Sequence, residues 1–230
     1  DHDGLLSVKA RGVRSNRSKL KGACQLLTYA EFTISDARGF TAITEATAIE
    51  MFPELRNDLL LLSRLENEKK IAKNQIIDMP GLMHQLYDDA HAYNVDYGHE
   101  LNLEIDSHCD LIGSDTELAS AFSNLVTNAI KYTPKGGTVT IGWHDDAEHG
   151  YFTVEDTGIG IDPKHLPRLT ERFYRVDSAR SRQTGGTGLG LAIVKHVLMQ
   201  HQAHLEIESK ENRGSIFKVV FPKERLYHVS

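Results

Sequence analysis

The stretch Gln183–Val194 constrains the chain most, because it places four glycines directly before the apolar pattern of a helix. Glycine lets a backbone adopt positive φ and approach a ligand closely. The first turn of the helix then offers unpaired N–H groups and a positive dipole end to an anion. The loop therefore fits a phosphate site, although a plain structural turn explains it equally well. No Gly-Lys-Ser/Thr follows and no strand precedes it, so it matches neither the P-loop nor the dinucleotide fingerprint.

Composition narrows the class of protein. The 230 residues carry a formal net charge of −6, which argues against a nucleic-acid partner. The two cysteines, Cys24 and Cys109, lie far apart without metal-site spacing, and the twelve histidines form no HxxxH pair. These features predict a reduced, cytoplasmic setting. The longest purely apolar runs, such as Leu59–Leu62, have four residues, so no membrane span is expected, and no signal-peptide pattern opens the chain.

Apolar residues spaced three and four apart predict two helices in the first third of the chain. A short turn would join them into an antiparallel hairpin spanning about residues 1–70. One hairpin cannot bury both apolar seams, so we expect pairing with a second copy in a four-helix bundle. Packing of the hairpin on the rest of the chain is the alternative. The seams are Leu20, Ala23, Leu27, Ala30 and Ile34, then Met51, Leu55, Leu59, Leu62 and Leu65.

Helices and strands alternate from Ile76 onward. Strands are expected at 76–78, 100–105, 138–143, 151–155, 203–209 and 215–221. Helices are expected from Pro80, from Ser114 or Asp115 to about Tyr132, and behind the glycine loop. An α+β fold with helices layered on one largely antiparallel sheet accounts for this order over about residues 71–230.

Three polar residues form a stripe on the helix that ends near Tyr132. Asn124, Asn128 and Tyr132 are each four residues apart, and Lys131 lies beside them. Two asparagines can occupy a solvent-facing stripe by chance. An amide oxygen, however, suits Mg²⁺ that bridges to phosphates. Lys131 could neutralise phosphate oxygens, and Tyr132 could cover a flat ring.

A carboxylate followed by alternating glycines ends the strand 151–155. In Asp156–Ile161 this pattern fits a tight turn with a side-chain hydrogen bond. It fits equally well a carboxylate that accepts hydrogen bonds from an exocyclic amine, with Gly158 and Gly160 letting a purine lie against the backbone. Its place between the asparagine stripe and the glycine loop favours a nucleotide site.

Four segments in this order resemble the boxes of sensor histidine kinases. Asn124–Thr133 resembles the N box, and Asp156–Gly160 resembles the G1 box. Arg172–Arg175 resembles the F box, and Gly186–Leu191 resembles the G2 box. The likeness covers about residues 76–221 and implies a Bergerat-type (GHKL) ATP-binding α/β sandwich. Residues 167–186 are most similar to kinases of the phosphate-regulon (PhoR) type, and 55–66 resemble the end of their second dimerisation helix.

The resemblance implies roles for individual residues, with ATP and Mg²⁺ as cofactors. Asp156 would bind the adenine amino group, and Asn128 would ligate Mg²⁺. The segment from about 166 to 187 would be the ATP lid. The remaining nucleotide-binding residues would be Asn124, Lys131, Tyr132, Gly158, Gly160, Phe173, Tyr174, Arg175, Arg180, Gly186, Thr187, Gly188, Leu189 and Gly190.

The phosphoacceptor motif of that family is absent. Where a histidine followed by an acid and a proline would stand, the chain has Asn16–Gly22, and Arg17 lies about at the histidine's place. No catalytic residue is therefore assigned. Engineering, a sequence error and degeneration of the motif all fit this loss. ATP-hydrolysing relatives carry a glutamate one turn before the Mg²⁺ asparagine, whereas Asn124 cannot act as that base.

The sequence thus predicts the cytoplasmic core of a sensor histidine kinase whose parent is membrane-anchored through segments outside this chain. Its expected activity is transfer of the γ-phosphoryl group of ATP to a histidine and then to a response-regulator aspartate. The expected partners are a second copy, bound through the hairpin, and a receiver domain. A slow ATPase of the same fold and a nucleotide-responsive dimeric binding module are the alternatives.

Overall fold

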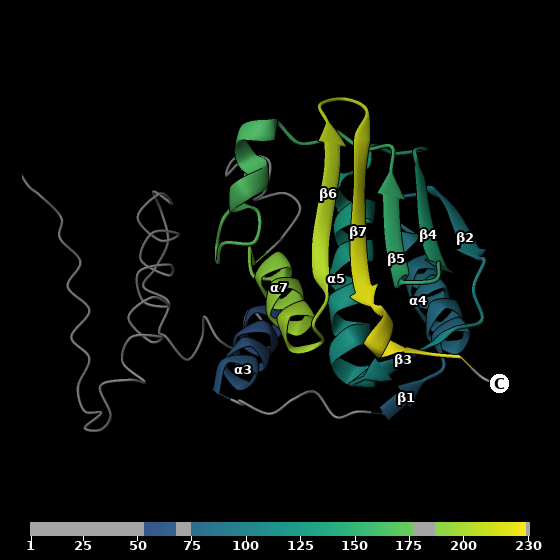
Figure 1. The fold of residues 1–230 in the computed structure, drawn as a ribbon. Helices are drawn as coiled ribbons and strands as arrows, with labels where there is room; N and C mark the ends of the chain where they lie inside the picture. The colour runs from purple at the N-terminus through teal and green to yellow at the C-terminus, as the bar shows by residue number, and fades with distance from the viewer. Residues whose placement is uncertain (1–52, 68–74, 177–186, 229–230) are drawn as a thin grey trace, which may run out of the picture. The chain divides into compact units, whose positions relative to one another are not determined.

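The computed structural model describes residues 53–67, 75–176 and 187–228 (Figure 1). The chain divides into two units, Asp1–Pro53 and Glu54–Ser230. The predicted first helix and Arg17 lie outside the described residues, so the hairpin stays a prediction. The second predicted helix is α3 (Pro53–Asn67), which begins at its proline, and from Glu54 onward it belongs to the second unit.

A five-stranded sheet forms the centre of the second unit, in the order β2-β4-β5-β7-β6. Its neighbouring strands are antiparallel except β2 and β4, which run parallel. The parallel pair joins Glu100 to Thr138 at one end and Ile105 to Trp143 at the other. The strands are β2 (Glu100–Ile105), β4 (Thr138–Asp145), β5 (His149–Asp156), β6 (His204–Lys210) and β7 (Gly214–Pro222).

Three helices cover one face of this sheet (Figure 1). They are α4 (Met79–Asn94), α5 (Asp115–Tyr132) and α7 (Gly190–Gln200). The core forms where α5 meets the sheet, because the rings of Phe122 and Phe152 stack with centroids 3.9 Å apart. Trp143 is fully buried, and its indole Nε1–H donates to the Cys109 carbonyl at 3.0 Å. The predicted α+β layered sandwich is confirmed.

A second, three-stranded sheet was not predicted. It pairs β1 (Gln75–Ile77), β3 (Asp110–Gly113) and β8 (Leu226–Tyr227), all antiparallel, in the order β1-β3-β8. The expectation of one sheet was wrong for this reason, and the strand at 76–78 belongs to this smaller sheet. The three strands have at most four residues each, too few for an alternating pattern to reveal them.

Local signals explain where the helices begin. The Asp78 carboxylate caps α4 by accepting from the Gly81 N–H at 3.0 Å, and Pro80 occupies the first turn. Asp115 and Glu117 place negative charge in the first turn of α5. The segment between β5 and α7 contains the 3₁₀ helix η1 (Pro163–Arg168), and a second one, η2 (Lys223–Arg225), precedes β8.

The apolar seam of α3 is in part buried within its own unit. Leu62 and Leu65 belong to the hydrophobic core and are 3% and 7% exposed. The Gln200 side-chain amide of α7 donates to the Leu65 carbonyl at 2.8 Å. These contacts favour the alternative in which this seam packs on the rest of the chain. Within the described ranges, no helix is both long and apolar enough to cross a membrane.

Candidate nucleotide-binding site

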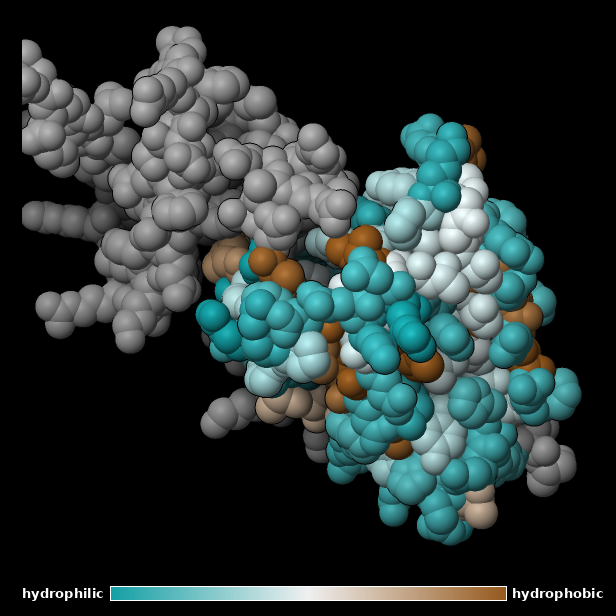
Figure 2. Space-filling view, turned by 90° about the horizontal axis from the view of Figure 1, so that it is seen from above, coloured by the Kyte–Doolittle hydropathy of each residue, from teal (hydrophilic) through white to brown (hydrophobic). Residues whose placement is uncertain are grey.

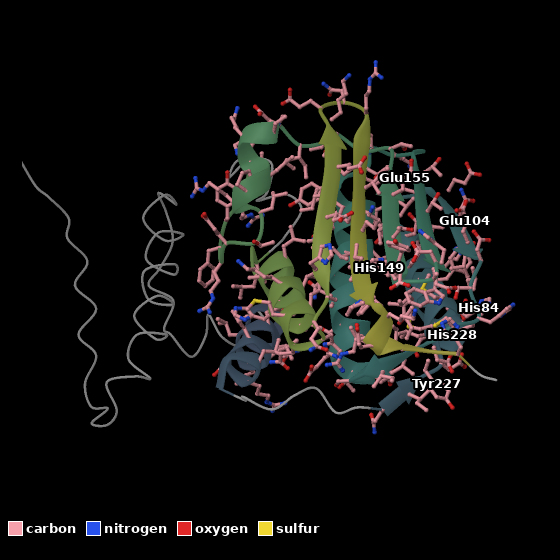
Figure 3. The ribbon with its side chains drawn as sticks, in the orientation of Figure 1. His84, Glu104, His149, Glu155, Tyr227 and His228 are labelled. Carbon is pink, nitrogen blue, oxygen red and sulfur yellow. The ribbon has the colours of Figure 1, made fainter. Side chains whose placement is uncertain are left out.

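Asp156 ends β5, with its carboxylate held inside the domain. The residue is 6% exposed, and its Oδ1 accepts the Gly158 backbone N–H at 2.7 Å. Its neighbour Glu155 points to the opposite face of the sheet and is exposed, as the alternation of a strand requires. Figure 3 shows Glu155 towards the end of β5 at which Asp156 lies, with His149 further along the strand, away from this end.

Burial raises the pKa of the Asp156 carboxyl to about 6, from an ordinary value of 3.8. Hydrogen bonds from the Gly158 and Ser215 backbones oppose this shift, since they stabilise the charged form. The carboxylate is therefore mostly ionised at neutral pH. It is a hydrogen-bond acceptor that little water reaches, and such a group recognises an N–H donor strongly.

The turn after Asp156 lies directly against the end of α5. The Ile159 N–H donates to the Tyr132 carbonyl at 3.2 Å, and a Cβ on Gly158 would lie 2.6 Å from that carbonyl oxygen. Gly160 has a φ of 65°, and a Cβ there would lie 2.0 Å from the Lys210 carbonyl oxygen. Glycine is required at both positions. The G1-like turn and the end of the α5 stripe therefore lie side by side.

The asparagine stripe of α5 faces the glycine loop. A Cβ on Gly190 would lie 2.5 Å from Asn124 Oδ1. The Asn124 Nδ2 donates to the Ser120 carbonyl at 2.9 Å, which leaves the amide oxygen directed towards the loop. Asn128 is one turn further along and partly buried. The helix contact between α5 and α7 therefore brings the N-like and G2-like segments together.

The end of the α5 stripe is more open. Tyr132 is 38% exposed, which suits a ring that covers a ligand. The Lys131 ammonium lies 5.8 Å from the centre of the Tyr93 ring on α4, which in turn stacks on Tyr97. The sequence pattern did not identify Tyr93 as a neighbour of this stripe, because α4 and α5 are joined by a long connection.

A backbone hydrogen bond connects the F-like and G2-like segments. The Phe173 N–H donates to the Gly188 carbonyl at 2.8 Å. Phe173 has a φ of 61°, which is rare for a residue with a side chain. Gly188 has a φ of 71°, and a Cβ there would lie 2.9 Å from the Phe173 Cα. This close approach requires glycine at position 188, and it fixes the position of the glycine loop before α7.

Side chains of η1 fix the position of Tyr174. Its hydroxyl lies 2.6 Å from His165 Nδ1, and the Arg168 guanidinium lies 4.2 Å from the centre of its ring. Arg175 follows and is partly buried. The first part of the predicted lid is therefore anchored on the domain. Arg180 and Gly186 lie outside the described residues, and so does the rest of the predicted lid before Thr187.

Two contributors to the site were missed by sequence reasoning. Ser215 on β7 supports the Asp156 carboxylate with its backbone N–H, and Asp58 on α3 accepts a hydrogen bond from the Thr187 hydroxyl at 2.8 Å. Both act through pairings far apart in the sequence. A serine opposite the end of β5 or an aspartate in a helix of leucines carries no pattern that would reveal them.

The metal ligands that the described residues offer at this site are the amide oxygens of two asparagines. The described residues contain no group of three histidines, cysteines or carboxylates able to hold a metal alone. The amide oxygens of Asn124 and Asn128 remain, and Mg²⁺ commonly takes one or two protein ligands together with phosphate oxygens and water. Figure 2, which views the end of the sheet where β5 finishes, shows mostly polar residues with small apolar groups between them.

This fold and site define a class of ATP-binding domain. Residues 113–225 match the family of histidine kinase-, DNA gyrase B- and HSP90-like ATPases. Among solved structures, the mycobacterial sensor histidine kinase MprB aligns with a TM-score of 0.57 and 27% identity, covering 65% of this chain and 97% of that one. Full-length ShkA in complex with AMPPNP aligns with a TM-score of 0.65 over 79% of this chain and 40% of that one, at 23% identity.

Sequence relatives narrow the class. The phosphate regulon sensor protein PhoR of Pseudomonas aeruginosa is 52% identical over 167 residues, 73% of this chain and 38% of the relative. Its counterpart from Haemophilus influenzae is 46% identical over 146 residues, 64% of this chain and 34% of the relative. Through these residues the chain belongs to the phosphate-regulon type of sensor histidine kinases. It spans little more than a third of the length of these relatives.

The first part of the chain matches a different family. Residues 1–52 match the N-terminal region of recombination protein O. That match ends at residue 52, close to the boundary of the two units between Pro53 and Glu54. It covers the place of the missing phosphoacceptor motif, including Arg17, and provides a reason for its absence: the segment resembles something other than the first helix of a kinase hairpin.

Proposed function

We propose that the second unit binds ATP or ADP with Mg²⁺ at the site between α5, the turn after β5 and the glycine loop. The observation that carries this proposal is the buried Asp156 carboxylate, which is followed by a turn whose glycines pack closely against the end of α5 and the end of β6. The exocyclic amine of adenine supplies the N–H donor that such a carboxylate requires. Tyr132, partly exposed at the end of α5, would cover the base.

The phosphates would lie at the other end of the site. Thr187–Leu191 would offer backbone N–H groups at the start of α7, and the dipole of that helix favours an anion. Lys131 and Arg175 would add positive charge. Asn128, with Asn124 beside it, would ligate Mg²⁺, which supplies charge neutralisation between the phosphate oxygens when bound.

Phosphoryl transfer to a histidine is the reaction that this site supports best. Asn124 occupies the position at which ATP-hydrolysing relatives carry a glutamate base, and an amide cannot accept a proton from water. Catalysis would rest on positioning and charge neutralisation. Because residues 1–52 lack the acceptor motif, the acceptor would be a histidine on a separate kinase chain, followed by a response-regulator aspartate. The membrane-anchored parent would hold this domain in the cytoplasm.

A nucleotide-responsive binding module is the second candidate. The match of residues 1–52 to another family favours it, because a chain without an acceptor helix can bind ATP and still not label itself. Arginine has no free lone pair for attack on phosphorus, so Arg17 cannot replace the histidine. Dimerisation through the hairpin stays a proposal for either candidate.

Calorimetry and labelling together test these proposals. We expect Mg²⁺-dependent binding of ADP to the intact chain, and no acid-labile label after incubation with γ-labelled ATP. Adding a separate phosphoacceptor hairpin from a phosphate-regulon kinase should produce label on that hairpin if the transfer proposal holds. Absence of nucleotide binding would refute the whole assignment. Binding without transfer to the added hairpin would leave the binding module.

A further inference from the structure

Asp58 connects α3 to the glycine loop. Its Oδ2 accepts a hydrogen bond from the Thr187 hydroxyl at 2.8 Å, across 129 positions of the chain. The same Thr187 oxygen accepts the Leu189 N–H at 3.2 Å. A short chain of hydrogen bonds therefore runs from Leu189, the residue before α7, through Thr187 to a carboxylate on another helix.

This bond is one of several contacts that hold α3 in place. Figure 1 shows α3 beside α7, and the Gln200 amide of α7 donates to the Leu65 carbonyl at 2.8 Å. Leu62 and Leu65 are buried in the core. The two hydrogen bonds lie near opposite ends of α7, at the residues that precede it and at its last residue. The α3 helix is therefore held against α7 at two separate points.

The docked α3 occupies groups that an incoming phosphate would use. A phosphate at the start of α7 would use the Thr187 hydroxyl and the Leu189 N–H as donors. The hydroxyl donates to Asp58 of α3, and the N–H donates to the Thr187 oxygen within the loop. Docking of α3 and binding of phosphates therefore make opposing demands on the same loop.

We propose that α3 is an intramolecular competitor of the nucleotide's phosphates, with Asp58 as the positioning residue that holds Thr187 in the nucleotide-free arrangement. The inference rests on the proposed nucleotide binding. By linkage, phosphate binding loosens α3 as much as α3 weakens phosphate binding. Nucleotide occupancy is thereby communicated to α3, the helix that follows the first unit in the sequence.

Binding measurements on the intact chain test the competition. Asp58→Ala should tighten binding of AMPPNP with Mg²⁺ roughly three- to tenfold, an effect of the usual size for coupled sites. Adenosine has no phosphates, so its affinity should stay the same. Asp89→Ala is the matched control, because Asp89 is an exposed aspartate on α4 and its replacement removes the same charge. This variant should leave the affinities for AMPPNP and adenosine unchanged.

Amide hydrogen exchange gives an independent measurement. AMPPNP, but not adenosine, should accelerate exchange of the amides between Leu59 and Leu65, and Asp58→Ala should do so without ligand. If AMPPNP binds equally well to the intact chain and to Asp58→Ala, and α3 exchange is unaffected by it, the competition is refuted while nucleotide binding stands. If neither chain binds any nucleotide, both proposals fail.

Discussion

The two ends of the candidate site are built differently. The base end is formed by Asp156, whose carboxylate is buried and receives backbone hydrogen bonds from Gly158 and Ser215. The phosphate end is formed by a loop fixed by two contacts from elsewhere, the Phe173 backbone and the Asp58 side chain. The base end is therefore part of the folded core. The arrangement of the phosphate end depends instead on which group is hydrogen-bonded to the loop.

The largest expected effect tests whether the base end is part of the core. Gly160→Ala should lower the free energy of unfolding by about 2–4 kcal/mol, because the new Cβ would meet the Lys210 carbonyl at 2.0 Å in a left-handed backbone conformation. Gly136→Ala is the matched control, since its φ is 80° but nothing lies within 4 Å. It should cost only about 1 kcal/mol in urea denaturation. Equal losses would contradict the steric argument.

The next effect concerns base recognition. Asp156→Asn should weaken ADP binding by roughly 10- to 100-fold, because the amide can present an N–H group where the ligand also has a donor. Glu155→Gln removes the same charge one residue away on the exposed face and should change the affinity by less than about twofold. Calorimetry at pH 7.5 compares the two variants. An effect of equal size in both would assign the loss to general electrostatics.

A pH series sharpens the same point. The pKa of Asp156 is raised to about 6, so ligand binding that needs the carboxylate should be complete above pH 7 and fall as pH drops through 6. At pH 5 the loss should be about tenfold, since one pH unit below a pKa leaves about a tenth ionised. Adenosine affinity should be measured across this pH range for the intact chain and for Asp156→Asn. The affinity of the variant should not change with pH, because residue 156 then carries no titratable group.

Titration of Asp156 should affect the stability of the fold in the opposite direction from ligand binding. A carboxyl whose folded pKa is raised contributes most below its unfolded value of 3.8, and this contribution is lost as pH rises through about 6. The ionised, buried Asp156 thus costs stability at neutral pH. The carboxylate that would recognise the base is retained at the expense of the fold.

The smallest expected effect lies in the anchor of the lid. Arg168→Ala removes a cation above the Tyr174 ring and an exposed ion pair with Glu171, so it should lower the unfolding free energy by only about 0.5–1 kcal/mol. ADP affinity should change by less than twofold. A large loss of affinity would show that the first part of the lid contributes directly to binding.

Sequence reasoning succeeded where periodicity is strong. The bounds of α5 and the central strands were predicted closely, and the asparagine stripe and the turn at Asp156 do meet in space. The small sheet was missed, because β3 pairs with residues about 35 positions before it and over 110 after it. Parallel pairing of β2 with β4 was missed for a similar reason: the order of strands in a sheet follows from packing of the connecting helices and not from the residues of either strand.

The α3 helix illustrates a different kind of difficulty. Its leucine spacing was read as a seam for a second copy, and the same leucines serve to pack it on its own unit. An apolar stripe shows that a face will be covered but not by what. The position of Asp58 next to Thr187 follows from that packing, so it could not be anticipated from either segment alone.

Trp143 gives the molecule a built-in reporter. It is the chain's single tryptophan, and its indole is fully buried in the core with its N–H bonded to the Cys109 carbonyl. Indole emission shifts to longer wavelength when water reaches the ring, so the fluorescence of this chain reads the opening of the domain core directly. Ligand titrations followed by this signal should be almost silent, whereas denaturant titrations should give one large change for the second unit.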